Sequence, residues 1–325
     1  MNRSAYNILI LSAGRRVELV ECFQSARDSM GIQGKIVTAD ASLTAPASYF
    51  ADACYQIARI GEDDYIPQLI QVCKKEDIAL VIPTIDTELL TLVSFREQME
   101  RETGAKVLLS SERTIQICRD KTSTQKFFEE HGFGVPREYQ EGEEPNHYPV
   151  FIKPKNGSSS VNAFRVNCRE ELDFFRNYVP EPIVQEYMEG VEYSIDVFCD
   201  FAGKPITIVP RIRLAVRGGE ILQGKIVKDR ELIEDVRRLI EELVPIGQIT
   251  VQCMKTEEGI RYIEINPRFG GGTPMSIKSG ANSCKHLYRL LQGEVLEYRE
   301  DYREELTFLR FDASIALDEQ MVVVE

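Results

Sequence analysis

The chain has 325 residues, enough for about two domains, and its 39 lysines and arginines against 52 aspartates and glutamates give a formal net charge of −13. Such an acidic chain repels a phosphate backbone, so nucleic acid is not expected as a partner, and any anionic ligand needs a local basic pocket. The eight cysteines lack metal-ligand or disulfide spacing, and the apolar run at 8–11 is too short for a membrane span or secretion signal, which predicts a reduced cytoplasmic protein without a membrane partner.

The first 114 residues alternate between strand and helix patterns. The first strand pattern is continuously apolar, as in a strand that is buried on both faces of a parallel sheet. Runs that indicate strands are residues 7–11, 35–40, 79–83 and 106–109. Between them, apolar side chains recur at helical spacing, as in Leu19, Phe23, Ala26 and Met30. This alternation predicts an α/β domain with a doubly wound parallel sheet over residues 1–114.

The turn after the first strand lacks the dinucleotide-binding fingerprint. That fingerprint needs three glycines for close approach of a pyrophosphate, and this turn has Gly14 followed by Arg15 and Arg16. A nicotinamide dehydrogenase is therefore the weakest interpretation, while the two arginines either bind an anion at the helix start or lie in solvent. Acidic residues follow two of the strands, at Asp40 and within 83–88, where they either cap the next helix or contact a substrate.

From about residue 115 the pattern changes to α+β. Two helical segments end near His131, and from Val150 onward the chain is rich in strands and hairpins. One more long helix is expected at about 229–244. We therefore place a domain boundary near residue 115, which gives domains 1–114 and 115–325.

A lysine and a hydroxyl-rich loop form the first candidate site. Lys153 ends a strand, and the loop after it contains Ser158, Ser159 and Ser160. Backbone N–H groups and serine hydroxyls of such a loop can surround phosphate oxygens, while the lysine supplies positive charge. The loop lacks the spacing of a P-loop, and the alternative interpretation is a surface hairpin.

A hairpin near the C-terminus carries the second candidate site. Centring its turn on Glu258 places Gln252 opposite Glu264, and period-two alternation places Ile263 and Ile265 on the other face. The polar face comprises Gln252, Met254, Glu264 and Asn266. One carboxylate beside amide oxygens suits Mg²⁺, which completes its shell with water and phosphates, whereas an isolated glutamate on a strand would face solvent.

The third candidate site is a strand end and the connection after it, residues 184–192. Backbone N–H and C=O groups in such a hinge can bind an adenine edge, and Glu192 can accept from two ribose hydroxyls. Alone the pattern is weak, because many strand pairs share it. The hinge comprises Gln185, Glu186, Tyr187 and Met188.

The order and spacing of these three sites resemble those of the ATP-grasp superfamily, and the resemblance extends over the whole chain. The chain is most similar to one ATP-grasp unit of the carbamoyl-phosphate synthetase large subunit and to related carboxylate–amine ligases. The string Glu264-Ile265-Asn266-Pro267-Arg268 is the most specific motif. The resemblance implies a pre-ATP-grasp domain, then an ATP-grasp domain that clamps ATP between a small subdomain of about 115–190 and a large subdomain of about 191–325.

The resemblance also implies a role for each candidate residue. The implied nucleotide ligands are Lys121, Lys153, Ser158, Ser159, Ser160, Gln185, Glu186, Tyr187, Met188, Glu192 and Met254. The implied ligands of Mg²⁺, with Mn²⁺ as an alternative ion, are Gln252, Glu264 and Asn266. Arg268 would steady the transferred phosphoryl group. Arg211 and Arg213 point the same way from one strand and either clamp an acceptor carboxylate or acyl phosphate or form a basic strip on an exposed strand.

Two departures from the synthetase pattern bear on the product. The chain has length for a single unit, and the run Phe269-Gly270-Gly271-Gly272-Thr273 is more similar to carboxylate–amine ligases. We expect a ligase that uses ATP to phosphorylate a carboxylate or bicarbonate to an acyl phosphate, which an amine or ammonia attacks. The alternative is an ATP-binding module or subunit without independent turnover. Carbamoyl phosphate as product, and a homodimer or a partner subunit, are left open.

Overall fold

Five parallel strands form the N-terminal sheet, in the order β3-β2-β1-β4-β5. The computed structural model describes residues 5–140, 142–155 and 161–324. The strands are β1 (Asn7–Leu11), β2 (Ile36–Asp40), β3 (Ala53–Gln56), β4 (Ile78–Ile82) and β5 (Lys106–Val107). The connections contain α1 (Val17–Ser29), the short 3₁₀ helix η1 (Pro46–Tyr49), α2 (Tyr65–Lys75) and α3 (Asp86–Thr103).

Both faces of this sheet are covered. Ile8 and Ile10 of β1 belong to one hydrophobic cluster, and Leu9 and Leu11 belong to a second cluster on the opposite face. The continuous apolar run follows from this double burial. The predicted α/β architecture with an N-terminal parallel sheet is confirmed.

The edge strand β3 was not among the predicted strands. Ala53 and Tyr55 are half-buried, whereas Cys54 and Gln56 are exposed. An edge strand with one partly covered face needs no continuous apolar run, so its sequence does not differ enough from a loop.

The C-terminal part is built on a six-stranded antiparallel sheet of order β14-β13-β10-β11-β12-β15. Its strands are β10 (Val191–Cys199), β11 (Pro205–Arg217), β12 (Glu220–Ile226), β13 (Gly247–Thr256), β14 (Gly259–Asn266) and β15 (Thr307–Leu309). Three helices accompany it: α4 (Glu112–Arg119), α5 (Lys121–Glu130) and α7 (Arg230–Leu243). Phe127 and Phe128 of α5 and Leu239 of α7 share one hydrophobic cluster with Val251 and Ile265 of the sheet.

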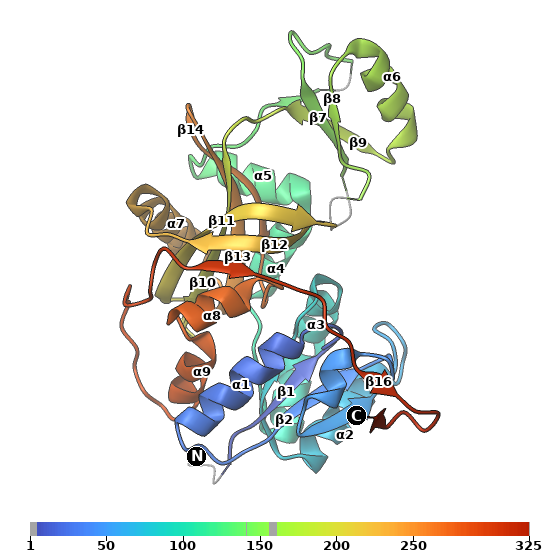
Figure 1. The fold of residues 1–325 in the computed structure, drawn as a ribbon, viewed down its shortest axis with the longest axis vertical. Helices are drawn as coiled ribbons and strands as arrows, with labels where there is room; N and C mark the ends of the chain where they lie inside the picture. The colour runs from blue at the N-terminus through green and yellow to red at the C-terminus, as the bar shows by residue number, and fades with distance from the viewer. Residues whose placement is uncertain (1–4, 141, 156–160, 325) are drawn as a thin grey trace.

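A separate four-stranded antiparallel sheet, of order β6-β9-β7-β8, lies at the opposite end of the molecule from the N-terminal sheet (Figure 1). It consists of β6 (Glu138–Tyr139), β7 (Val150–Pro154), β8 (Phe164–Val166) and β9 (Pro182–Glu186), with α6 (Arg169–Tyr178) packed on it. In the described part of the chain, its hydrophobic cluster draws only on residues between 139 and 184. This sheet therefore has a core of its own.

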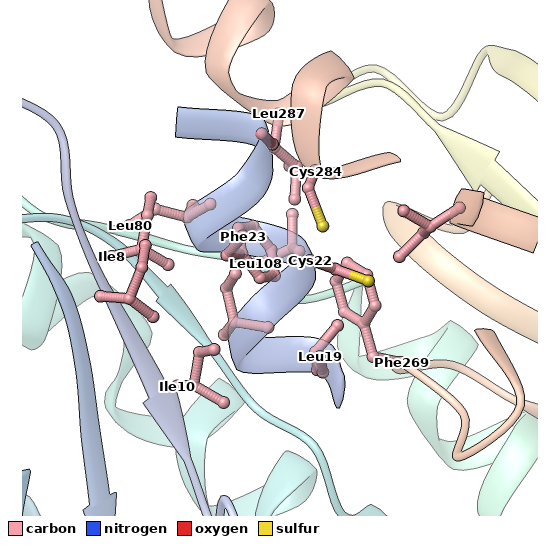
Figure 2. Close-up of a cluster of buried hydrophobic side chains, with 14 of the residues drawn as sticks. Ile8, Ile10, Leu19, Cys22, Phe23, Leu80, Leu108, Phe269, Cys284 and Leu287 are labelled. Carbon is pink, nitrogen blue, oxygen red and sulfur yellow. The ribbon is translucent and has the colours of Figure 1, made fainter. Parts of the chain in front are cut away.

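The N-terminal sheet and the six-stranded sheet are joined by a shared core around α1. After β14 the chain forms α8 (Thr273–Ser279) and α9 (Ser283–Leu291), and both pack against α1. Figure 2 shows Phe23 of α1 between Ile8 of β1 and Phe269 and Leu287 of the C-terminal part. The Phe23 and Phe269 rings meet edge to face with their centroids 5.8 Å apart. The N-terminal part and the segment after β14 therefore bury each other's apolar side chains, although they are distant in sequence.

The last described residues form a short hairpin of β16 (Ala316–Leu317) and β17 (Val323–Val324). The segment before it contacts the N-terminal part, since Arg15 and Asp312 form an ion pair at 3.4 Å. None of the helices in the described ranges is both long enough and apolar enough to cross a bilayer.

Replacing Phe23 with alanine should destabilise the protein by about 3–5 kcal/mol, because the fully buried ring is in contact with Phe269 and leaves a cavity. Denaturant unfolding measures the loss. Phe174→Ala on α6 is the control, since that ring is 61% exposed. An equal loss in both variants would contradict the shared core as the source of stability.

Candidate functional site

A cavity of about 340 Å³ lies between the four-stranded and the six-stranded sheets. Its lining includes these residues that the sequence singled out: Lys121, Lys153, Gln185, Glu186, Tyr187, Met188, Glu192, Arg213, Gln252, Met254 and Glu264. Asn266 and Arg268 do not line it, but they are linked by hydrogen bonds to Glu264. Ser158, Ser159 and Ser160 lie outside the described residues. The structure thus brings the three candidate sites together around one cavity.

The β13–β14 hairpin supplies one wall of the cavity, and its register is set by a bulge. Thr256 pairs with Gly259, so the turn is one position tighter than a turn centred on Glu258. Between Gln252 and Cys253 the register shifts by one residue, which restores the predicted pairing of Gln252 with Glu264.

The bulge also overturns the prediction that Ile263 faces away from Glu264. Tyr262 pairs with Cys253 and Glu264 pairs with Gln252, so Ile263 is the extra residue on β14. Ile263 lines the cavity beside Glu264, whereas Ile265 is buried in the core as predicted. A bulge re-aims one side chain and adds an apolar surface to the cavity that strict alternation misses.

Beyond Glu264, a chain of polar contacts leads to the N-terminal sheet. Asn266 Nδ2 donates to Glu264 Oε1 at 2.9 Å, and Arg268 Nη2 donates to Asn266 Oδ1 at 3.1 Å. The Arg268 guanidinium also pairs with Asp86, at 2.8 Å from Nη2 and 3.2 Å from Nε. Asp86 begins α3, so a residue of the N-terminal part holds the arginine of the C-terminal motif.

Two lysines line the cavity together with this hairpin. Lys153 lies near the end of β7, and Lys121 is the first residue of α5, where Asp120 caps the helix. Lys121 Nζ donates to the carbonyl of Pro154 at 2.9 Å. Burial lowers the pKa of Lys121, and burial together with the nearby charge of Lys121 lowers the pKa of Lys153 to about 8. Two partly desolvated ammonium groups in one cavity favour an anionic ligand.

An anion that these lysines bind, such as ATP, should bind more weakly as the pH rises through about 8. The Lys153 ammonium is mostly protonated at pH 7 and mostly neutral at pH 9, so the apparent affinity should fall about tenfold over this range if only the charged form binds phosphate. Equilibrium binding of a non-hydrolysable ATP analogue with Mg²⁺ measures the change. In Lys153→Arg the charge persists, and the fall should be smaller. An equal fall in both proteins would show that another group titrates.

The hinge after β9 contains two positions whose backbone groups have no partner among the described residues. Gln185 is buried and its Nε2 donates to Gln125 Oε1 at 3.1 Å, while the N–H of Glu186 donates to the carbonyl of Arg137 at 2.9 Å. In the part of the chain that the structure describes, the backbones of Tyr187 and Met188 form no hydrogen bond. At these two positions the backbone groups are available to a ligand, whereas the Gln185 side chain is already hydrogen-bonded.

Glu192 and Arg213 form an ion pair on the cavity wall. Arg213 Nε lies 2.9 Å from Glu192 Oε1, and its two terminal nitrogens donate to Ser194 Oγ and to the carbonyl of Gly219. Burial raises the pKa of Glu192, although Arg213 opposes this shift. Arg213 is thus rigidly held with its guanidinium at the cavity.

The interpretation of Arg211 as part of an exposed basic strip is wrong. Its side chain is only 2% exposed, and Nε and Nη2 donate to Asp196 Oδ2 at 3.3 and 3.1 Å. A Cβ at Gly272 would lie 2.7 Å from the Arg211 guanidinium. The backbone at Gly272 therefore passes so close to the buried ion pair that a side chain there would clash with it. The same strand therefore carries one structural arginine and one at the cavity.

The acidic residues after β2 and β4 mainly organise the turns around them. Asp40 accepts from the N–H of Gly14 at 2.9 Å. Glu88 is fully buried and accepts from Ser12 Oγ and from the N–H groups of Thr84 and Ile85. Burial raises the pKa of Glu88. The residue that sequence reasoning undervalued is Asp86, whose partner Arg268 is 182 positions away in the chain.

Comparisons with known proteins agree with this geometry. Residues 8–108 match a family model described as the PylC-like N-terminal domain, and residues 178–312 match one described as ATP-grasp in the biosynthetic pathway with Ter operon. The 3-methyl-D-ornithine–L-lysine ligase of Methanosarcina acetivorans is 26% identical over 279 residues, covering 85% of this chain and 72% of that protein. The carbamoyl-phosphate synthase of Methanobrevibacter smithii is 24% identical over 255 residues, covering 70% of this chain and 67% of that protein.

Solved structures show the same fold. N5-carboxyaminoimidazole synthetase from Staphylococcus aureus, complexed with ADP, superposes with a TM-score of 0.72 and 15% identity over 96% of this chain and 95% of its own. Two family models in chain order, relatives that are named ligases and a shared fold lead to one assignment. The chain belongs to the ATP-grasp superfamily, and the relatives that it matches include a named ligase.

Proposed function

We propose that the chain uses Mg²⁺ and ATP to phosphorylate a carboxylate, and that an amine or ammonia attacks the resulting acyl phosphate. One observation supports this proposal: Lys121 and Lys153 line the same cavity as Glu264 and Gln252. Cations that bind a triphosphate and oxygens that bind a divalent ion are the two requirements of phosphoryl transfer from ATP. In an otherwise acidic chain, their convergence favours a nucleotide.

The cavity suits ATP in size and lining. Its volume of about 340 Å³ lies within the range of small-molecule sites. Lys121 and Lys153 would bind the phosphates, Tyr187 and Met188 the adenine edge, and Glu192 the ribose hydroxyls. The proposed phosphate contacts of Ser158, Ser159 and Ser160 rest on the sequence.

The residues present fit a magnesium ion that is shared with nucleotide. In the described ranges, no group of three or more histidine, cysteine, aspartate or glutamate side chains is arranged to hold a metal. Glu264 with the amide oxygens of Gln252 and Asn266 therefore suits an ion that takes one carboxylate from the protein and its remaining oxygens from phosphates and water. When bound, Mg²⁺, or Mn²⁺ in its place, would neutralise charge on the β- and γ-phosphates.

The proposed reaction has two steps. A carboxylate oxygen attacks the γ-phosphorus, the bond to the β–γ bridging oxygen breaks, and ADP leaves with that electron pair. The amine nitrogen then attacks the acyl carbon, inorganic phosphate leaves, and the nitrogen loses a proton. Arg268 and Arg213 would stabilise the charge that develops on the transferred group.

The names of the relatives support an amino acid as a substrate, because they include a 3-methyl-D-ornithine–L-lysine ligase and a D-alanine–D-alanine ligase. Bicarbonate with ammonia is the second candidate, supported by the similarity to carbamoyl-phosphate synthase. Release of ADP from ATP and Mg²⁺, screened against pooled amino acids, other carboxylates, amines, bicarbonate and ammonia, tests both. Tight ATP binding without ADP release across the panel would favour an ATP-binding module instead.

A further inference from the structure

Arg16 is turned into the molecule, unlike its neighbour in the same turn. Its Nη2 donates to the carbonyl of Thr84, just beyond β4, at 2.5 Å. Arg15 instead has a side chain that is 80% exposed and pairs with Asp312. Arg16 forms no ion pair with any residue that the structure describes. Of the two alternatives that the sequence left open, solvent exposure therefore suits Arg15, and Arg16 is the candidate for binding an anion.

The acidic residues that act on Arg16 already serve other groups. They are Asp86, Glu88 and Glu220. Their partners are Arg268 for Asp86 at 2.8 Å, Ser12 Oγ for Glu88 at 2.8 Å, and Arg310 for Glu220 at 3.2 Å. Burial and the repulsion of Arg268 lower the pKa of Arg16 to about 10. A largely buried guanidinium without a carboxylate of its own favours an anionic ligand.

Arg268 is a second cation at the same turn: Arg16 contacts the carbonyl of Thr84, and Arg268 contacts Asp86, two residues further along the chain. The Nε and Nη2 of Arg268 donate to Asp86, whereas within the described ranges Nη1 has one long contact, 3.4 Å to the carbonyl of Phe269. Arg268 follows Asn266 by two residues, so it lies next to the proposed metal ligands. An anion between Arg16 and Arg268 would therefore lie beside the transferred phosphoryl group.

We propose that Arg16 and Arg268 form a two-arginine site for the carboxylate of the acceptor substrate. Arg16 binds this carboxylate from the N-terminal sheet, and Asp86 fixes the orientation of Arg268. The inference rests on the proposed ligase function and adds the residue that selects an acid as acceptor. The site bridges two domains, so the acceptor is recognised by both.

The test compares Arg16→Met with Arg15→Met, which removes the adjacent exposed arginine. Each protein is saturated with Mg²⁺ and a non-hydrolysable ATP analogue and titrated by calorimetry with glycine, L-lysine, D-ornithine, D-alanine and acetate, and with the amide of each. We expect at least one acid to bind the wild type and Arg15→Met alike, and to bind Arg16→Met about tenfold to 100-fold more weakly. The amides should bind none of the proteins at this site, and Arg16→Lys should recover part of the affinity.

Unchanged acid binding in Arg16→Met, equal binding of acid and amide, or no acid binding to the wild type would each overturn the arginine site. If Arg16 had only a structural role, Arg16→Met would lower the affinity for the ATP analogue as well as the affinity for the acid. Failure of the wild type to bind the ATP analogue counts instead against the ligase function. ADP release that continues with an unaltered acceptor KM in Arg16→Met leaves the ligase function intact and removes only this site.

Discussion

Replacing Glu264 with glutamine is expected to lower the kcat of Mg²⁺-dependent ATP turnover by about 100-fold to 1000-fold. Glu264 is the only carboxylate among the three proposed oxygen ligands, so the change removes the negative charge that would hold the ion. The replacement keeps an oxygen that can accept from Asn266 Nδ2, whose present distance to Oε1 is 2.9 Å. The fold should therefore persist. The rate of ADP release as a function of Mg²⁺ concentration measures the effect.

The control lies at the other end of the same hairpin. Glu258 has a side chain that is 78% exposed and pairs only with Arg261 in the described structure, at 3.0 Å. Glu258→Gln should retain the turnover of the wild type. If Glu264→Gln does so too, Glu264 is not part of the site.

Replacing Lys153 with methionine should raise the Kd for ATP by about tenfold to 100-fold, which corresponds to the loss of one charge-assisted contact of about 1.5–3 kcal/mol. Methionine keeps most of the aliphatic stem that packs in the cavity wall and removes only the charge. The folded protein should be slightly favoured rather than impaired, because burial and Lys121 already disfavour the Lys153 ammonium and lower its pKa. Calorimetric titration with an ATP analogue and Mg²⁺ measures the loss.

Lys126→Met is the matched control for Lys153→Met. Lys126 lies on α5, its side chain is 71% exposed, and it pairs with Glu130 at 3.6 Å. Its removal changes the net charge by the same amount without touching the cavity. Equal losses in the two variants would indicate a general charge effect and would remove Lys153 from the phosphate site.

Features with a local cause could be predicted from the sequence. The apolar run of β1 and the helical spacing in α1 reflect burial on both faces of the sheet. The hairpin prediction placed Gln252 opposite Glu264 correctly, although the assumed turn was one position too wide and a bulge compensates for it. The local pattern therefore predicts which residues pair across the hairpin. It contains no signal for the bulge that turns Ile263 toward the cavity.

Features with a tertiary cause could not be predicted in this way. Nothing near Asp86 indicates that it meets Arg268, because Asp86 begins α3 of the N-terminal part and Arg268 follows β14, 182 positions away. Arg211 and Arg213 look alike in sequence, yet β11 places the first beside Asp196 in the core and the second at the cavity. Whether an arginine of this strand is buried or lines the cavity depends on how deeply that part of the strand lies in the fold.

The shared core around α1 determines how chimeric enzymes should be made from this scaffold. A junction after residue 114 would take Phe23 from one parent and Phe269 and Leu287 from the other, so the two sides of the shared core would no longer match. Junctions on either side of the four-stranded sheet, whose cluster is self-contained, cut through far less packing. Recombination between homologous ligases should therefore exchange that sheet as a cassette and keep the remaining two parts from one parent.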